Sequence, residues 1–211
     1  MHFPATTPTD CLLLIAFPVT EPDFIADLAP GAPKDYAKSV AREFKLLPAF
    51  LWQYHHRPLA DLLKQIAADV SMRQVTVKFN STPDDLQDLS KFQVVTIIAH
   101  FNNASGQVEF ADRLYAMDDV VDRIDPNFQG VVDLSVCNST ALQDKIKERF
   151  GDQCHARANA ERAEIKVHLV LYKNIIERLA CRQEHYLQAM GTVRTQLASF
   201  IQSNITKHEK L

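Results

Sequence analysis

The sequence predicts an α/β fold in which helices cover both faces of a mostly parallel central sheet, giving three layers. Short apolar runs rich in β-branched residues, a pattern typical of buried parallel strands, occur at 11–17, 94–99 and 131–136. Segments with the three- and four-residue spacing of amphipathic helices lie between and after these runs. Because strands alternate with helices along the whole chain, we expect the strands to pair in parallel through crossover connections.

The composition is that of an ordinary soluble globular protein, with 211 residues of which 23% are charged and 46% hydrophobic. We expect one domain over 1–211, with a loose arm at 1–10 and a charged tail at 206–211. The formal net charge of -3 offers no basic surface for nucleic acid. No basic leader precedes the apolar run at 12–17, which is too short to span a bilayer, so we expect a cytoplasmic protein without membrane contact.

Four cysteines, Cys11, Cys137, Cys154 and Cys181, stand far apart in the sequence. Their spacing fits neither a zinc site nor a disulfide scaffold, so we expect free thiols. Cys11, Cys154 and Cys181 are expected to be small buried hydrophobic residues. The histidines show no spacing typical of metal ligands, and no cofactor or metal is expected.

The first half of the chain is expected to hold a central strand, an edge strand and several helices. The strand at 11–17 leads into a proline-rich connection at 18–33, expected to be irregular and to border a site. Residues 74–79 alternate polar and apolar side chains, which is typical of a strand nearer an edge. Helices, with a break at Pro48 and a cap at Thr82, are expected over 35–47, 50–54, 59–70 and 83–91.

The second half is expected to hold a small hairpin at 108–116, a strand near 153–159 and four helices. The helix after Cys137 carries an apolar face over 142–150, can be capped by Ser139 or Thr140, and is expected to stop at Gly151. The other helices are expected over 118–124, 165–179 and 186–205. The apolar stripe of the last helix is expected to face the core.

Two of the predicted strands end on residues that can carry out chemistry. The run at 94–99 leads into His100, and the run at 131–136 leads into Cys137. The carboxyl ends of parallel strands form the crevice where ligands bind. If these strands are neighbours, the imidazole can take the proton of the thiol, and the helix that follows Cys137 favours the thiolate. The backbone N–H groups of Cys137 and Phe101 are candidates to bind a developing oxyanion.

Asp133 is unusual because the rest of its strand is apolar. It faces the same way as Ser135 and Cys137, since side chains alternate along a strand. Buried carboxylates are normally paired, so we expect a structural, hydrogen-bonded role for Asp133. By the same reasoning, His100 and Cys137 could themselves be core residues without a catalytic role.

The strand leading to His100, the hairpin and acidic helix at 109–124, and the run Leu-Ser-Val-Cys-Asn-Ser at 134–139 together resemble the core of the caspase-like cysteine peptidases. The closest likeness is to the CHAT-type branch, which includes separase-type proteins. In that family the strand carrying the His is followed by a short hairpin, a helix and a strand ending Leu-Ser-x-Cys-Asn-Ser. The likeness covers about residues 92–200.

The resemblance implies a caspase-like fold and an endopeptidase that cuts protein or peptide substrates, with Cys137 as nucleophile and His100 as general base. It also implies that Ser135 and its neighbour Asn138 line the substrate pocket. In relatives that cut after Arg or Lys, an acidic residue often stands at the position of Ser135. Here Glu21, Asp23 or Asp27, after the first strand, could supply that charge instead. A partner protein that recruits or activates the enzyme is also implied.

Two alternatives remain open at this stage. The family usually has Gly directly after the His, and this chain has Phe101, whose Cβ restricts the backbone. This departure favours a catalytically inactive protein-interaction module with a caspase-like fold. The other alternative is a different α/β enzyme acting on a small molecule, but the five glycines form no phosphate-binding loop.

Overall fold

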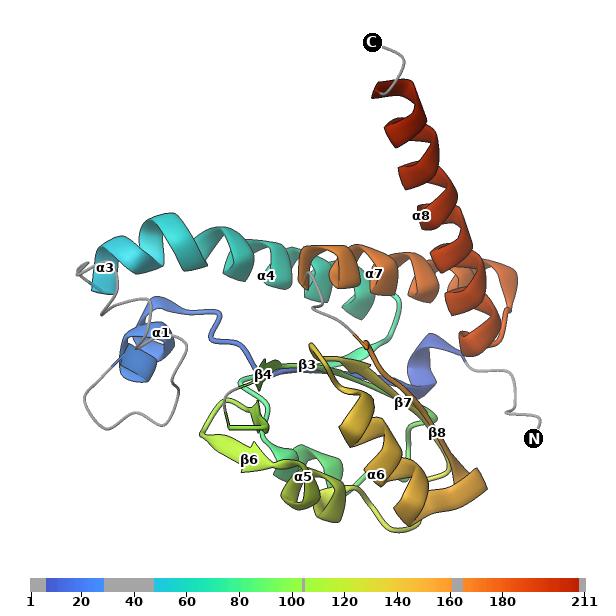
Figure 1. Ribbon diagram of the computed structural model, residues 1–211, viewed down its shortest axis with the longest axis horizontal. Coiled ribbons are helices and arrows are strands. Elements are labelled where there is room, and N and C mark those ends of the chain that lie inside the picture. The colour runs from blue at the N-terminus through green and yellow to red at the C-terminus, as the bar shows by residue number, and fades with distance from the viewer. Residues whose placement is uncertain (1–6, 29–47, 104, 161–164, 209–211) are drawn as a thin grey trace.

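The computed structural model describes residues 7–28, 48–103, 105–160 and 165–208. It confirms the α/β fold, with five strands in the order β2-β1-β3-β7-β8 and every neighbouring pair parallel (Figure 1). The strands are β1 (Cys11–Ile15), β2 (Thr76–Phe79), β3 (Val94–Ile98), β7 (Gly130–Ser135) and β8 (Cys154–Arg157). As predicted, β2 lies at an edge of the sheet.

Helices cover the sheet on both faces (Figure 1). One face carries α4 (Arg57–Ser71), α7 (Ile165–Arg182) and the start of α8 (Tyr186–His208), and the other carries α5 (Met117–Arg123) and α6 (Thr140–Phe150). Alternate residues of β1 belong to two separate apolar clusters, Leu13 facing α4 and α7 and Leu12 facing α5 and α6. The sheet is therefore buried on both faces, which explains the uninterrupted apolar runs of the sequence.

A small antiparallel sheet follows β3 directly. It consists of β4 (His100–Asn102), β5 (Gln107–Glu109) and β6 (Leu114–Ala116), and it leads into α5. The predicted hairpin is confirmed as the β5–β6 pair. The third strand, β4, was not predicted, because His100 was expected to end the preceding strand rather than to begin a new one.

The connection after β1 is not irregular throughout, as was expected, because it contains α1 (Glu21–Leu28). The hydroxyl of Thr20 donates a 2.6 Å hydrogen bond to Asp23 and accepts the Asp23 N–H at 3.4 Å, which satisfies the first turn of this helix. Pro22 stands in the same turn, where its missing N–H costs nothing. The helix expected over 35–47 lies outside the described residues.

Residues 29–47 lie outside the described residues, so the helix break expected at Pro48 stays a prediction. α3 (Pro48–Leu51) continues through a π-helical turn (Trp52–His56) into α4. Proline is tolerated in a first helical turn, where its backbone N–H would have no partner inside the helix. A ring nitrogen of His56 lies 2.7 Å from the carbonyl of Pro18, so this π turn is joined to the connection after β1.

The helix expected over 83–91 is wrong in length, because only a 3-10 turn (Pro83–Leu86) forms. Thr82 is confirmed as its cap, with the Thr82 N–H donating to the carboxylate of Asp85 at 2.9 Å. Beyond Leu86, the backbone bonds to the end of α5 instead of continuing as a helix. Asp125 donates its N–H to the Leu86 carbonyl at 2.7 Å, and its carboxylate accepts the Leu89 N–H at 3.3 Å.

The C-terminal helices are longer than expected. α6 ends at Gly151, as predicted, in a conformation with a φ of 54° that favours glycine. α8 runs to His208, so the tail expected from 206 begins inside the helix. Met190 is buried against the core, but Phe200 is 65% exposed where α8 projects from the body (Figure 1). Within the described side chains, the predicted stripe is core at Met190 and Val193 and only partly buried at Leu197.

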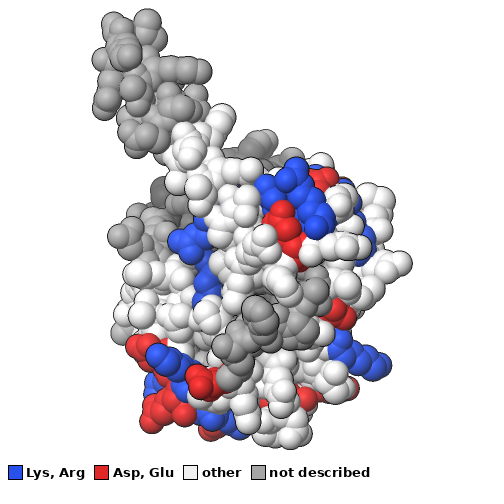
Figure 2. All heavy atoms as spheres, turned by 90° about the vertical axis from the view of Figure 1, so that its right-hand side faces the viewer, with Lys and Arg blue, Asp and Glu red and all other residues white. Residues whose placement is uncertain are grey.

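No helix among the described residues is both long enough and apolar enough to cross a membrane. On the face shown in Figure 2, side chains of both charge signs are interspersed and form no single-sign surface.

Candidate active site

The two strands that end on His100 and Cys137 are parallel neighbours. β3 and β7 pair directly, and their last matched residues are Ile98 and Ser135. His100 lies two residues beyond Ile98, and Cys137 lies two residues beyond Ser135. Since neighbouring strands are about 4.8 Å apart, both residues stand at the same carboxyl edge of the sheet. The prediction that these strands pair side by side in parallel is confirmed.

His100 continues the side of the sheet that faces α7. Ile98 belongs to the apolar cluster on that side, whereas Ala99, one position before His100, belongs to the opposite cluster. Cys137 lies in the turn that follows β7. The ring of Phe17, which follows β1, packs edge-on against the His100 ring with centroids 4.4 Å apart.

The turn that carries Cys137 is braced by one residue that follows β8, Asn159. Its side-chain nitrogen donates to the carbonyls of Leu134 and Val136 at 2.8 and 3.3 Å. Its backbone exchanges two further bonds with Ser139, accepting from the Ser139 N–H at 2.9 Å and donating to the Ser139 hydroxyl at 3.0 Å. Ser139 therefore holds the N-cap position of α6, as predicted, without a side-chain bond to that helix.

Asn138 ties the Cys137 turn to the loop that follows His100. Its side-chain nitrogen donates to the side-chain oxygen of Asn103 at 2.7 Å. Its φ of 47° lies in the left-handed region, which asparagine tolerates better than most residues. The structure thus gives Asn138 a bridging contact between the two halves of the site.

The four cysteines differ in how accessible their thiols are. Cys11 and Cys154 are buried, as predicted, whereas Cys181 is exposed on α7, against prediction. Burial raises the pKa of Cys154 to about 12, and burial together with the nearby Asp10 charge also raises the pKa of Cys11. Cys137 is partly exposed and lies just beyond the end of β7, two residues after Ser135.

The polar residue deeper in β7, Asp133, is fully paired. Its carboxylate accepts from the Nε of Arg157 at 2.5 Å and from the hydroxyl of Tyr186 at 2.6 Å. The same Tyr186 hydroxyl lies 3.3 Å from the Thr96 hydroxyl on β3. The predicted structural role of Asp133 is confirmed, because this carboxylate joins β7 to β8 and α8.

Ser135 lies between this buried group and Cys137. Its hydroxyl is 3.3 Å from Nδ1 of His168 on α7. Burial, followed by the positive charge of Arg157, lowers the pKa of His168, while Asp133 opposes the shift. A cavity of about 10 Å³ lies here, lined by Asp133, Ser135, Arg157, His168, Leu171, Tyr172 and Ile175. This space holds about one water molecule and no amino-acid side chain.

The acidic residues expected to serve the substrate pocket lie elsewhere. Glu21 and Asp23 are on α1, and Asp23 accepts a 3.1 Å hydrogen bond from Asn80, which follows β2. β1 and β3 separate β2 from β7, so Asn80 and Ser135 are about 14 Å apart across three strand spacings. The structure does not bring Asp23 to Ser135, and the Asp27 side chain lies outside the described residues.

Phe101 lies in a strand. It is the middle residue of β4 and pairs with Val108. Its side chain packs against the apolar cluster on the α5 and α6 side. His100, next to it, contacts Phe17 in the cluster on the opposite side. The two neighbouring side chains therefore point to opposite faces of β4.

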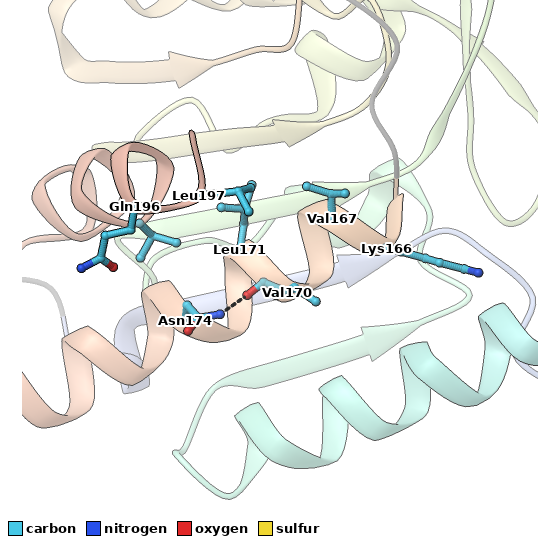
Figure 3. Close-up of a pocket in the computed structure, with 8 residues that line it drawn as sticks. Lys166, Val167, Val170, Leu171, Asn174, Gln196 and Leu197 are labelled. Carbon is cyan, nitrogen blue, oxygen red and sulfur yellow. Dashed lines mark hydrogen bonds between the residues drawn. The ribbon is translucent and has the colours of Figure 1, made fainter. Parts of the chain in front are cut away.

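A larger groove lies away from the strand ends, between α7 and α8 (Figure 3). Its volume is about 460 Å³, and its walls are mostly apolar. The lining residues are Lys166, Val167, Val170, Leu171, Asn174, Val193, Gln196 and Leu197. Lys166 is the one ionisable side chain among these lining residues, so the groove offers no acid–base pair.

In the part of the chain that the structure describes, no three His, Cys, Asp or Glu side chains gather to hold a metal ion. Comparison with models of protein families, with curated proteins and with solved structures gives no match to this chain.

Proposed function

We propose that this protein is a cysteine endopeptidase of the caspase-like type, which hydrolyses peptide bonds through a Cys137–His100 dyad. The observation that carries the proposal is the parallel pairing of β3 with β7, matched at Ile98 and Ser135, with a base and a thiol each two residues farther on. A nucleophilic thiol needs a base within reach, and neighbouring strand ends are a rigid way to supply one.

In this mechanism the His100 imidazole takes the proton of the Cys137 thiol, and the thiolate attacks the carbonyl carbon of the substrate. The oxyanion that forms accepts a hydrogen bond from the Cys137 backbone N–H. The C–N bond then breaks, and the leaving amine takes the proton from His100. Water attacks the resulting thioester with His100 again as base, which releases the acid and restores the thiol.

The order of elements also supports the proposal. In the caspase-like peptidases, the strand carrying the His is followed by a hairpin, a helix and the strand that leads to the Cys. This chain has β3, then the β4–β6 sheet, then α5 and β7 in the same order. α6 begins at Thr140, three residues after Cys137, where its positive end favours a thiolate.

The competing proposal is a catalytically inactive interaction module, and it depends on Phe101 in place of glycine. A bulky residue here would oppose catalysis if its side chain filled the space between His100 and Cys137. Phe101 instead packs on the α5 and α6 side, away from Phe17 and His100. This packing favours the peptidase, because it leaves the α7 side of the site to the dyad.

The proposed substrate is a protein or peptide, and the proposed setting is the cytoplasm. The four cysteines are all free, which suits a reducing compartment. The cavity beneath Ser135 is too small for a side chain, so we propose that a recruiting or activating partner opens it.

Active-site labelling tests the proposal directly. Peptidyl acyloxymethyl ketones with basic, acidic and apolar lead residues are incubated with the wild type and with Cys137→Ala, His100→Ala and Cys181→Ala. We expect labelling of the wild type and of Cys181→Ala, no labelling of Cys137→Ala, and a rate for His100→Ala at least about 100-fold lower. Cys181 is the matched control, because its thiol is exposed but lies on α7.

Mass spectrometry identifies the labelled residue, and thermal unfolding checks that each variant is folded. Labelling of Cys181 instead of Cys137, or equal labelling of His100→Ala and wild type, contradicts the dyad. If no probe of any lead residue labels the folded wild type, the interaction module becomes the better proposal.

A further inference from the structure

A carboxylate lies opposite the proposed base on the neighbouring strand. In the antiparallel β4–β5 pair, His100 is matched directly with Glu109. Directly opposite residues in such a pair have Cβ atoms about 4.5–5.5 Å apart and project from the same face. The register alone therefore brings the Glu109 side chain alongside the His100 imidazole.

The packing of the small sheet shows which face the two residues share. Phe101, Val108 and Tyr115, one on each of its three strands, all pack into the α5 and α6 cluster. His100 and Glu109 alternate with these residues and so project from the opposite face, the one that carries Phe17.

Glu109 is only 8% exposed, which is unusual for a glutamate on a short hairpin. An ionised carboxylate in such a place is costly unless a positive or hydrogen-bonding group compensates it. The other strongly buried acids of the described chain have such groups: Asp133 has Arg157, and Asp125 has two backbone N–H donors. The group that the register offers to Glu109 is the imidazole of His100.

We propose that Glu109 is the positioning residue of this site, in that its charge stabilises the imidazolium form of His100. This inference rests on the proposed function. When Cys137 transfers its proton to His100, the imidazolium forms beside an ionised carboxylate that keeps its own charge. Glu109 takes no proton and does not touch the substrate, so it acts only through His100. The expected result is a larger fraction of the thiolate–imidazolium pair at neutral pH.

Among the neighbours that strand pairing and ring contact give His100, Phe17 is apolar and Glu109 and Cys137 can titrate. Removing the charge of Glu109 while keeping its size isolates its effect from that of the thiol. Glu109→Gln does this, and Glu109→Asp keeps the charge as the conservative variant. Asp112→Asn is the matched control, because Asp112 lies on the same hairpin but bonds to Tyr115, whose ring faces the other side.

The experiment follows the His100 imidazole by NMR as a function of pH in the full-length protein, independently of any substrate. We expect the His100 pKa to fall by about one to two pH units in Glu109→Gln, since an opposite charge at this range shifts a pKa by that amount. Glu109→Asp, whose carboxylate is one methylene farther from His100, should lower the His100 pKa by a smaller but measurable amount, and Asp112→Asn should leave the His100 pKa unchanged. Alkylation of Cys137 by iodoacetamide at pH 7 should slow about tenfold in Glu109→Gln.

The outcomes separate this inference from the proposed function. A fall of the His100 pKa in Glu109→Gln, together with a wild type that no peptidyl probe labels, supports the Glu109 inference and contradicts the peptidase. If peptidyl probes label the wild type but His100 has the same pKa in Glu109→Gln as in the wild type, the Glu109 inference is overturned and the peptidase proposal stands. If Glu109→Gln does not fold, the comparison of Glu109→Asp with the wild type decides. The carboxylate of the shorter Asp side chain is farther from His100, so an unchanged His100 pKa in Glu109→Asp contradicts a direct charge effect.

Discussion

Asp133 and Cys137 lie four residues apart, one inside β7 and one in the turn that follows it, and their surroundings differ. Asp133 is 3% exposed and is bonded to Arg157 and Tyr186. Cys137 is partly exposed, and its turn is held through backbone atoms by Asn159. A polar side chain inside the layer is neutralised by partners and becomes structural, whereas one beyond the end of the strand is positioned by others and stays accessible.

We therefore expect substitutions inside β7 to change stability and substitutions just beyond its end to change reactivity. Variants at the Asp133 end should unfold more easily, and variants at the Cys137 end should fold normally and lose reactivity. The predictions that follow test this separation.

The largest difference is expected between the thiols. With a pKa of about 12 against an ordinary 9.0, Cys154 has about 1,000-fold fewer thiolates than an unperturbed cysteine at the same pH. We expect iodoacetamide at pH 8 to modify Cys137 and Cys181 and to leave Cys154 and Cys11 unmodified in the folded protein. Peptide mapping by mass spectrometry measures this, and modification of Cys154 as fast as Cys181 contradicts it.

The next largest effect is expected at the inner end of β7. Asp133→Ala leaves the Arg157 guanidinium, 12% exposed, without its carboxylate. Removing one partner of a buried ion pair costs about 3–5 kcal/mol of the free energy of unfolding. Urea unfolding measures the loss, with Cys137→Ala as the control expected to stay within about 1 kcal/mol of wild type. Equal losses for the two variants would remove the distinction between the two ends.

A smaller loss of stability is expected for Tyr186→Phe. This change removes the hydroxyl that donates to Asp133 at 2.6 Å and keeps the buried ring. A hydrogen bond to a charged group contributes about 1.5–3 kcal/mol to the free energy of unfolding. Since Arg157 still pairs with Asp133 in this variant, the loss measured by urea unfolding should be less than that of Asp133→Ala. A larger loss would mean that Tyr186, not Arg157, is the principal partner.

The smallest effect is expected for the pH dependence of stability at His168. Burial and Arg157 lower the His168 pKa in the folded protein, so the unfolded chain binds a proton first as the pH falls below about 6.5. The free energy of unfolding should therefore decrease from pH 6.5 down to the lower folded-state pKa. His168→Gln should flatten this part of the curve, measured by urea unfolding at several pH values. An unchanged slope contradicts the assignment to His168.

The sequence was sufficient to predict the layers and the pairing of the reactive strands. Apolar runs such as 94–99 and 131–136 have one interpretation when helices alternate with them, because both faces of a parallel sheet must be covered. The alternation rule also put Asp133 and Ser135 on one face, and both bond to helices on the same side of the sheet. The helix end at Gly151 and the cap at Thr82 were predictable too, because each depends only on residues next to it in the sequence.

The supporting residues of the site could not be predicted, because their contacts join distant parts of the chain. Asn159 follows a strand as an ordinary loop residue, and only the fold brings it to the carbonyls of Leu134 and Val136. Glu109 resembles a surface residue until the β4–β5 register places it opposite His100. β4 itself is three residues long, too short for an alternating pattern to be recognised.

The second half of α8 projects from the body of the molecule (Figure 1). Tyr186 is buried and anchors the start of the helix in the core. Phe200 lies fourteen residues farther along the helix, about 21 Å away at 1.5 Å per residue. A binding partner that contacted the helix at Phe200 would therefore lie about 21 Å from Tyr186 along the helix.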